Sequence, residues 1–337
     1  METGGCMINA KRGKFVYSIF LFTLTTLCSA WTWTYKKDFV LNNADKVAYF
    51  NQKTRFFKQL IFSWNAHRPP KGYFKFSVSV HTSSGWSKWF ETADWGAGIQ
   101  QSYLSKDKDI AFYHVRLEIP NRVADAFKIK IESIDGVDLS LLKIVTVSVS
   151  NKELFEPEKY NDLKDLKSVY IKNIPIQSQM VLRHEDKDRI CSPTSLSMLV
   201  GYLDKKRLDP LKVAKNSFDD GLQVYGSWPF NIAHAFELFP KCKFSVVRLS
   251  SFKSLHEYLT KGIPVVVSIR GNLKTAAKDY PNGHLVLVNG WSREKKLIHV
   301  HDPAFKRNSQ VKHSYRVNDF LKAWENSYRL AYVVDCG

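Results

Sequence analysis

Between residues 58 and 150 the chain alternates apolar and polar side chains with a period of two. The clearest runs are residues 74–80, 113–119, 127–131 and 145–149. A period of two puts one set of side chains on the buried face of a strand, and several such strands separated by turn residues favour an antiparallel sandwich or barrel. We therefore predict an all-β, jelly-roll-like sandwich for residues 31–150.

The pattern changes at residues 151–168, which are charged, contain Pro157 and show no alternation, so we place a linker there. Within residues 192–203 apolar side chains then recur at the spacing of one helical face. The later apolar runs predict helices at 229–238 and 254–260 and strands at 244–249, 265–269, 284–289 and 297–301. A helix followed by a mostly antiparallel sheet is typical of an α+β domain, which we assign to residues 169–337.

The chain begins with the pattern of a secretion signal. Three basic residues precede an uncharged run at residues 15–28, and small residues occupy positions −3 and −1 of a cleavage site after Ala30. We predict that residues 1–30 are removed, that the mature chain begins at Trp31, and that it is secreted, periplasmic or on the cell surface without a membrane span. An uncleaved anchor and a start at Met7 are the alternatives, and the mass of exported protein tests them.

The charge balance adds little to this picture. There are 50 Lys and Arg residues against 32 Asp and Glu, a net charge of +18. This charge suits an anionic partner, but we favour the simpler interpretation of a solvated basic surface. No basic run is concentrated and no nucleic-acid motif is present, so we predict no nucleic-acid partner. Six of the nine tryptophans fall in the predicted sandwich. Most are expected in its core, and exposed ones would make a cell-wall or surface glycan a second partner.

Cysteine usage points to a free thiol. After removal of the signal, Cys191, Cys242 and Cys336 remain. Because three is odd, at least one thiol has no intramolecular partner, and unpaired thiols are uncommon in oxidising compartments unless they are buried or used. A bridge between Cys242 and Cys336 would leave Cys191 free, although two separate buried thiols satisfy the same count.

Cys191 lies just before the predicted helix, where Pro193 suits the first turn and the Ser192 and Thr194 hydroxyls are expected to accept bonds from the free amides. The positive helix end favours thiolate, the nucleophilic form. A catalytic thiol also needs a base and a group that orients the base. His284 opens one predicted strand and Asp302 follows the next, with residues 290–296 as the hairpin loop between them.

If the hairpin folds back at residue 293, His284 stands directly opposite Asp302, within reach of a carboxylate-to-imidazole hydrogen bond. Cys191 would then attack a carbonyl, His284 would take and return the proton, and Asp302 would orient the imidazole. The oxyanion requires donors, for which we choose the Cys191 amide and the side chain of Gln179 over that of Gln177.

We predict no cofactor and no metal. The residues that resemble ligands are His299, His301, Asp302 and His313, and their spacing matches no metal-site pattern.

Six ordered segments resemble papain-like cysteine peptidases related to the bacteriocin-processing, double-glycine-leader peptidases. They are "IPIQSQM", "CSPTSLSMLVGYL", "YGSWPFNIAHAFE", "GIPVVVSIR", "GHLVLVNGW" and "HVHDPAF". The resemblance implies a papain-like fold with Cys191 as nucleophile, His284 as base, Asp302 as orienting residue and Gln179 in the oxyanion hole. Family members commonly have glycine after the cysteine, where this chain has Ser192; its amide serves equally unless the turn needs a positive φ.

The resemblance implies an exported, two-domain cysteine peptidase that cleaves a peptide or related amide bond in a peptide or protein substrate. The spans and phosphate-binding loop of peptidase-bearing transporters are absent from the sequence, so we reject a transporter role. The alternative from another functional class is a surface-binding or adhesion protein, in which the sandwich binds a glycan and the peptidase-like domain is inactive.

Overall fold

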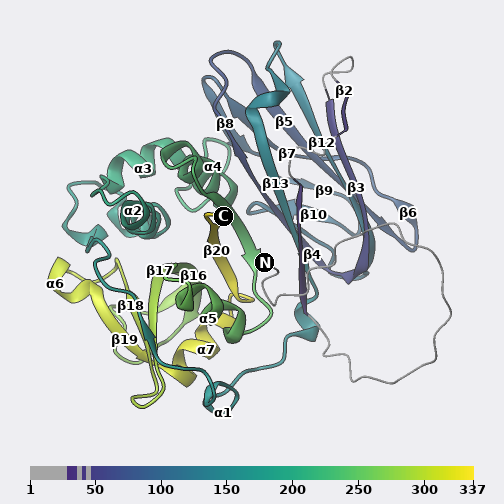
Figure 1. The fold of residues 1–337 in the computed structure, drawn as a ribbon. Helices are drawn as coiled ribbons and strands as arrows, with labels where there is room; N and C mark the ends of the chain where they lie inside the picture. Colours follow the sequence, from purple (N-terminus) through teal and green to yellow (C-terminus); the bar gives the residue numbers. More distant parts are fainter. Residues whose placement is uncertain (1–28, 36–39, 43–46) are drawn as a thin grey trace.

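The computed structural model describes residues 29–35, 40–42 and 47–337 (Figure 1). Apart from Ser29 and Ala30, the predicted signal peptide lies outside these residues. Across the described ranges the fold is rich in antiparallel sheet with a few helices. None of its helices is both long and apolar enough to cross a membrane.

Two antiparallel sheets form the N-terminal region. The first has the order β1 (Ala30–Tyr35), β13 (Leu142–Ser150), β4 (Gln59–Ala66), β11 (Arg116–Glu118), β10 (Ala111–Tyr113) and β9 (Ser105–Lys106). The second has the order β2 (Val40–Asn42), β3 (Val47–Phe57), β12 (Ala124–Ile134), β5 (Tyr73–Thr82), β7 (Phe90–Gly96) and β8 (Ile99–Ser102), and β6 (Gly85–Trp86) pairs with β5.

Alternate residues of both sheets point into one apolar core, as period-two patterning requires. Trp64 of β4 stacks on Phe76 of β5 with ring centroids 4.0 Å apart, and Trp95 packs edge-on against Trp64. These three rings are fully buried, whereas Trp86 is 40% exposed. Aromatic packing therefore ties the first sheet to the second.

The C-terminal domain is built on a third antiparallel sheet. Its strands are β15 (Lys243–Arg248), β20 (Leu330–Asp335), β16 (Val265–Gly271), β17 (Tyr280–Ser292), β18 (Leu297–His301) and β19 (Lys312–Arg316), with β14 (Val169–Tyr170) paired to β17. Its helices are α2 (Cys191–Leu203), α3 (Pro210–Ser217), α4 (Trp228–Leu238), α5 (Phe252–Thr260), α6 (Asn308–Val311) and α7 (Val317–Glu325), and the short helix α1 (Tyr160–Leu163) lies in the segment before it. In Figure 1, α2, α3 and α4 gather on one side of this sheet, and α5 and α7 on the other.

Helix α2 is buried on nearly all sides, and this decides where its polar side chains bond. The structure begins the helix at Cys191 itself, one residue earlier than predicted. The Ser192 and Thr194 hydroxyls do not cap it as predicted: Ser192 bonds to the hydroxyl of Tyr332 (2.9 Å), and Thr194 donates to the carbonyl of Ile190 (2.7 Å). A buried hydroxyl must find a partner inside the protein, and these two bonds supply one for each.

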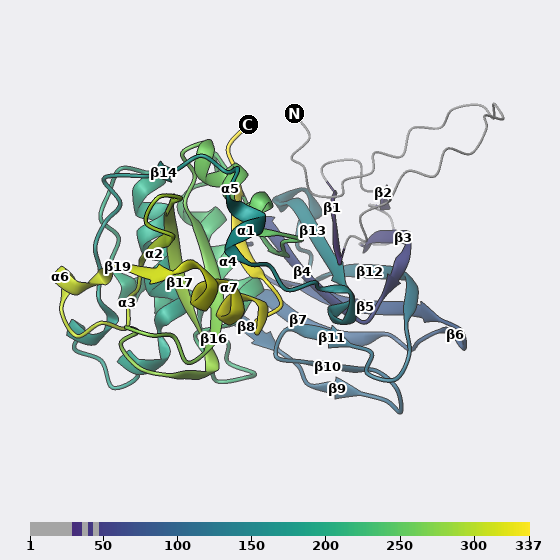
Figure 2. The same cartoon turned by 90° about the horizontal axis from the view of Figure 1, so that it is seen from below.

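The N-terminal region packs closely on the C-terminal domain, and α4 lies beside β4 in both views (Figures 1 and 2). The free edge of β15 is covered by side chains of the first sheet. Asn65 accepts from the N–H of Phe244 (2.9 Å) and donates to its carbonyl (2.7 Å), and the Ser63 hydroxyl accepts from Val246 N–H (3.2 Å). Edge-strand groups that would otherwise be unpaired are thus satisfied by side chains.

The segment at residues 151–168 connects the two parts but is not a free linker. Leu163 is buried in the core of the C-terminal domain. The Glu158 carboxylate accepts from the N–H of Phe252 (2.8 Å) and lies 3.4 Å from the guanidinium of Arg329. Burial, opposed in part by Arg329, raises the pKa of Glu158. The segment therefore holds a fixed course along the C-terminal domain.

Cys242 and Cys336 form a disulfide, and Cys191 is the free cysteine among the described residues. The sequence left a bridge and two separate thiols open, and the structure shows the bridge. The bridge joins positions 94 residues apart in the sequence.

Reducing this bridge is expected to destabilise the fold. Closing a loop of about this length stabilises a protein by roughly 4–5 kcal/mol when the effect comes from the entropy of the unfolded chain. Cys336→Ser should therefore lower the free energy of unfolding in denaturant by several kcal/mol. Non-reducing peptide mapping of the natural chain should find Cys242 linked to Cys336 and Cys191 alkylated, and a bridge that includes Cys191 would contradict its assignment as nucleophile.

Candidate active site

Cys191, His284 and Asp302 come from three elements that meet beside the start of α2. Cys191 is the first residue of α2, His284 lies in β17, and Asp302 directly follows β18. The Ser195 hydroxyl, one turn into α2, donates to the carbonyl of Leu285 (2.9 Å). This bond fixes the helix start against the strand that carries His284.

A bulge at Asn289 in β17 decides how His284 faces Asp302. Beyond the bulge Leu287 pairs with His301. If this register continues, the residue opposite Asp302 lies one position before Leu287 in β17. His284 lies two positions before that residue, and so on the same face of the hairpin. Without the extra residue the two side chains would point to opposite faces. The prediction of a directly opposed pair is wrong in register, yet diagonal contact brings His284 Nε2 to 2.8 Å from Asp302 Oδ1.

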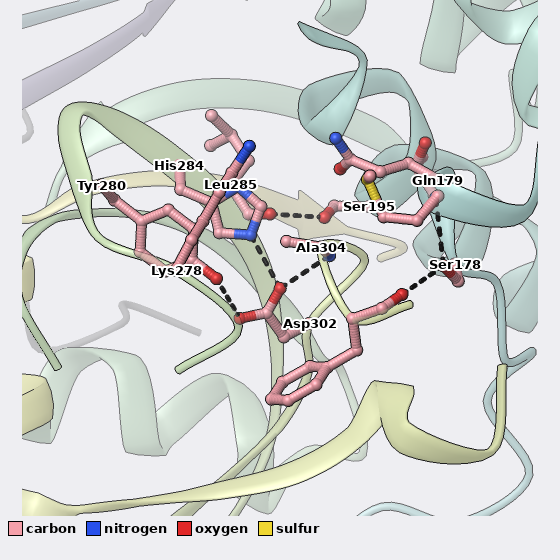
Figure 3. A network of polar contacts seen from close by, with 12 residues as sticks. Ser178, Gln179, Ser195, Lys278, Tyr280, His284, Leu285, Asp302 and Ala304 are labelled. Atoms are coloured by element: carbon pink, nitrogen blue, oxygen red, sulfur yellow. Dashed lines mark hydrogen bonds and ion pairs between the residues drawn. The ribbon is translucent and has the colours of Figure 1, made fainter. Parts of the chain in front are cut away.

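Asp302 is fully buried and accepts four hydrogen bonds. Oδ1 receives the imidazole of His284 and the N–H of Ala304 (2.9 Å), and Oδ2 receives the hydroxyls of Tyr280 (3.0 Å) and Tyr315 (2.6 Å). Figure 3 shows Tyr280, His284 and Ala304 converging on this carboxylate. Such a set of donors favours the ionised carboxylate, and with the charge of His284 it lowers the pKa of Asp302 in spite of burial.

The two tyrosines are site residues that the sequence did not reveal. Tyr280 also stacks on the imidazole of His284, with ring centroids 4.1 Å apart and planes 14° from parallel. The predicted strand began only at residue 284, whereas β17 begins four residues earlier, at Tyr280. The prediction therefore left Tyr280 outside the strand. Recognising the longer strand would have placed Tyr280 on the face of His284, whereas Tyr315 is brought in by β19, which was not predicted.

The imidazole and the thiol influence each other. Burial lowers the pKa of His284, but the charge and hydrogen bond of Asp302, with a contribution from Cys191, outweigh it and raise that pKa to about 9. Burial raises the pKa of Cys191, and the hydrogen bond and charge of His284, with the N–H of Leu285, lower it below its ordinary value. The raised pKa of His284 and the lowered pKa of Cys191 both favour a thiolate beside an imidazolium. Because Asp302 holds Nε2, the second ring nitrogen, Nδ1, is left to face the thiol.

Gln179 and Gln177 have different surroundings. Gln177 donates from Nε2 to the carbonyl of Leu208 (2.5 Å) and accepts from the Ser197 hydroxyl (2.6 Å), so it ties α2 to a neighbouring loop. Gln179 donates from Nε2 to the carbonyl of Lys187 (2.7 Å), and its Oε1 is buried without a partner among the described residues. One Nε2 hydrogen of Gln179 is therefore left for another acceptor.

An ion pair joins the two sides of the site at the surface. Lys278 Nζ lies 3.0 Å from Asp188 Oδ1, and Asp188 is three residues before Cys191. Both charged side chains are about half exposed, so the pair contributes little to stability.

The other histidines near the site have local partners. His299 bonds to the Ser314 hydroxyl (2.8 Å), His301 to the carbonyl of Pro175 (3.1 Å), and His313 to the Thr275 hydroxyl (3.0 Å). In the part of the chain that the structure describes, no three His, Cys, Asp or Glu side chains converge as metal ligands would.

Comparison with known proteins gives two findings. Residues 171–332 match the Peptidase_C39 like family. The chain is also similar to the crystal structure of Xylellain, a cysteine protease from Xylella fastidiosa, with 14% identity over 54% of this chain and 91% of that chain and a TM-score of 0.35. A search of curated proteins finds no match.

Proposed function

We propose, on the premise that residues 171–332 form a papain-like cysteine peptidase related to the C39 family, that Cys191, His284, Asp302 and Gln179 carry out its hydrolysis. The observation that carries this proposal is the position of His284. Its Nε2 is bonded to Asp302 and its pKa is raised, while its charge and hydrogen bond lower the pKa of Cys191.

The proposed reaction has two halves. The Cys191 thiolate attacks the carbonyl carbon of a peptide or related amide, and the negative oxygen accepts bonds from the Cys191 N–H and the spare hydrogen of Gln179 Nε2. His284 gives its proton to the leaving amine as the carbon–nitrogen bond breaks, which leaves a thioester. His284 then takes a proton from water, whose oxygen attacks the thioester and releases the acid and the thiolate.

The serine after the nucleophile fits this reaction. Ser192 is part of α2 and is not among the described residues with a positive φ. The backbone at this position therefore does not require glycine, and serine adopts it without strain. The hydroxyl of Ser192 is occupied by Tyr332 and stays out of the reaction.

The pH dependence tests the ion pair. Since the pKa of Cys191 is lowered, its alkylation by iodoacetamide should stay fast below pH 8.5, where a free cysteine slows tenfold per pH unit. Hydrolysis should fall as the pH rises through about 9, because His284 then loses the proton that the leaving amine needs. Because the thiol and the imidazole titrate as a coupled pair, both changes with pH report on the pair and not on one residue alone.

The matched comparison is His284→Ala, which removes the strongest cause that lowers the Cys191 pKa. Its alkylation should follow the profile of an ordinary thiol. The assignment of His284 as partner would be wrong if the variant and the natural chain shared one profile.

We also propose that the chain is exported and that residues 31–150 form a β-sandwich domain joined through residues 151–168 to the peptidase domain at 169–337. The Cys242–Cys336 bridge supports export, because disulfides persist in oxidising compartments. The two facing sheets with one core support the sandwich.

Labelling with a thiol-reactive peptide electrophile, followed by mapping of the modified residue, tests the proposed function most directly. Modification confined to Cys191, dependent on His284, is the expected result. If the electrophile instead modified no cysteine in folded protein, the site would be inactive and the surface-binding alternative would take its place.

A further inference from the structure

A groove of about 990 Å³ lies between the N-terminal region and helices α3 and α4. One wall is the β7–β8 hairpin with Ile99 near its tip, and the other is formed by residues of α3, α4 and the loop after α3. Its volume is at the upper end of the range for ligand pockets, enough for a segment of extended chain. Both halves of the protein are needed to form it.

The walls of the groove are held in place by polar bonds that are partly or fully buried. Gln100 donates from Nε2 to the carbonyls of Asn216 (3.0 Å) and Phe218 (2.7 Å), and its Oε1 accepts from Arg68 (2.7 Å). Asp219 is fully buried and accepts the N–H of Ser102 (2.9 Å) from β8. The hairpin of the N-terminal region is therefore fixed to the loop after α3.

The charges that line the groove are balanced. Arg68 lies 2.9 Å from Glu237, which also bonds to His234 (3.0 Å), so this cluster neutralises itself. Lys215 and Asp220, both exposed, supply one charge of each sign on the rim. The groove therefore has no excess charge that would attract a charged ligand. Its apolar side chains can pack against an apolar group of a ligand. The apolar lining residues are Ile99, Leu211, Ala214, Phe218 and Leu238.

The groove reaches the segment that leads to the nucleophile. His184 and Tyr225 line it, and the Tyr225 hydroxyl donates to Asp186 (3.2 Å), five residues before Cys191. Arg189, two residues before Cys191, donates to the carbonyl of Gln223 (2.7 Å) in the same loop as Tyr225. Hydrogen bonds therefore join the loop that lines the groove to the segment that ends at Cys191.

We propose that this groove is a subsite for the polypeptide substrate, where it takes a bulky apolar side chain at a distance from the scissile bond. This inference rests on the proposed function. It makes the N-terminal region a part of the substrate-binding surface, with Ile99 as a specificity-determining residue. Short amides that do not reach the groove are processed without its help.

The test compares Ile99→Asp with Leu104→Asp in the full chain. Leu104 is 68% exposed in the same region and does not line the groove, so it is the matched control. Hydrolysis is measured with fluorescently labelled casein as a long unstructured polypeptide and with a library of acyl-dipeptide amides, and cleavage sites in casein are mapped by mass spectrometry. Iodoacetamide alkylation of Cys191 reports the state of the catalytic pair.

Ile99→Asp should raise KM for casein about tenfold, the usual effect of a mismatched side chain in an apolar pocket, without changing kcat, dipeptide hydrolysis or alkylation. It should also shift one position of the mapped sites from bulky apolar to basic residues. Leu104→Asp should change none of these. Equal effects of both variants, or no effect of Ile99→Asp, would overturn the inference while leaving the proposed function intact. If the natural chain cleaved neither substrate, the proposed function and this inference would both fail.

Discussion

Replacing Cys191 with alanine is expected to remove hydrolysis almost completely, by about 10⁶-fold, because no neighbouring group can supply the thiolate. Covalent labelling by a peptide electrophile should disappear with it. The fold should persist, since Cys191 is only half-buried and the start of α2 is held by Ser195 and Thr194. Circular dichroism and thermal unfolding of the variant check this before any rate is compared.

Gln179→Ala is the informative comparison, because it removes one oxyanion donor and leaves Cys191 and His284 in place. Turnover should fall by about 10²–10³-fold, and alkylation by iodoacetamide, which forms no oxyanion, should be unchanged. The variant also leaves the carbonyl of Lys187 without the bond from Nε2, so its thermal unfolding must be measured too. Gln179→Glu keeps the size of the side chain but presents negative charge to the oxyanion, and it should be at least as impaired.

Two results would contradict this assignment. If Cys191→Ala retained natural activity in a folded, contaminant-free preparation, the nucleophile would lie elsewhere or the peptidase reading would be wrong. If Gln179→Ala slowed alkylation and hydrolysis by the same factor, its role would be to hold the loop before Cys191 and not to stabilise an oxyanion.

The positions of helices and strands could be predicted from the sequence more accurately than the way these elements face one another. Strand 297–301 and helices at 192–203 and 229–238 appear within a residue of their predicted ends, because long apolar periodicity and burial agree in them. Helices α3 and α7 and strand β19 were missed. They are short and amphipathic, and their conformation depends on packing against the larger elements.

The register of the hairpin that carries His284 shows why geometry was harder. The predicted loop at 290–296 is shorter in the structure, where β17 continues to Ser292. A bulge at Asn289 then restores the face on which His284 and Asp302 meet. No local signal in the sequence marks that extra residue, since its backbone is fixed by contacts with Ile171: the Asn289 side chain donates to the Ile171 carbonyl (3.0 Å) and its own carbonyl accepts the Ile171 N–H (2.8 Å).

The contact between the N-terminal region and the C-terminal domain could not be predicted from the periodicity of apolar residues either. Asn65 and Ser63 alternate with apolar residues in β4, a pattern that predicts a solvent-facing side of a strand. They are buried instead, because they bond to the edge strand β15. Polar side chains that satisfy a partner backbone look in sequence like ordinary surface residues.

Asp302→Asn is expected to lower kcat by about 10⁴-fold, between the losses for Gln179→Ala and Cys191→Ala. The asparagine can keep the local geometry. Its Oδ1 can accept from His284 and Ala304, and its amide can donate to the hydroxyls of Tyr280 and Tyr315, which rotate to accept. What it removes is the negative charge that raises the pKa of His284.

The pH profile separates this charge effect from simple misfolding. Without the carboxylate the pKa of His284 should fall from about 9, so the loss of activity at high pH should move to lower pH. Tyr315→Phe is the matched control, because it deletes one donor to Oδ2 and keeps the charge. Its kcat should fall less than tenfold and its high-pH limit should stay in place. If Asp302→Asn kept kcat within tenfold of the natural chain, or lost activity without moving that limit, the carboxylate would be holding the loop after β18 and would have no part in orienting the base.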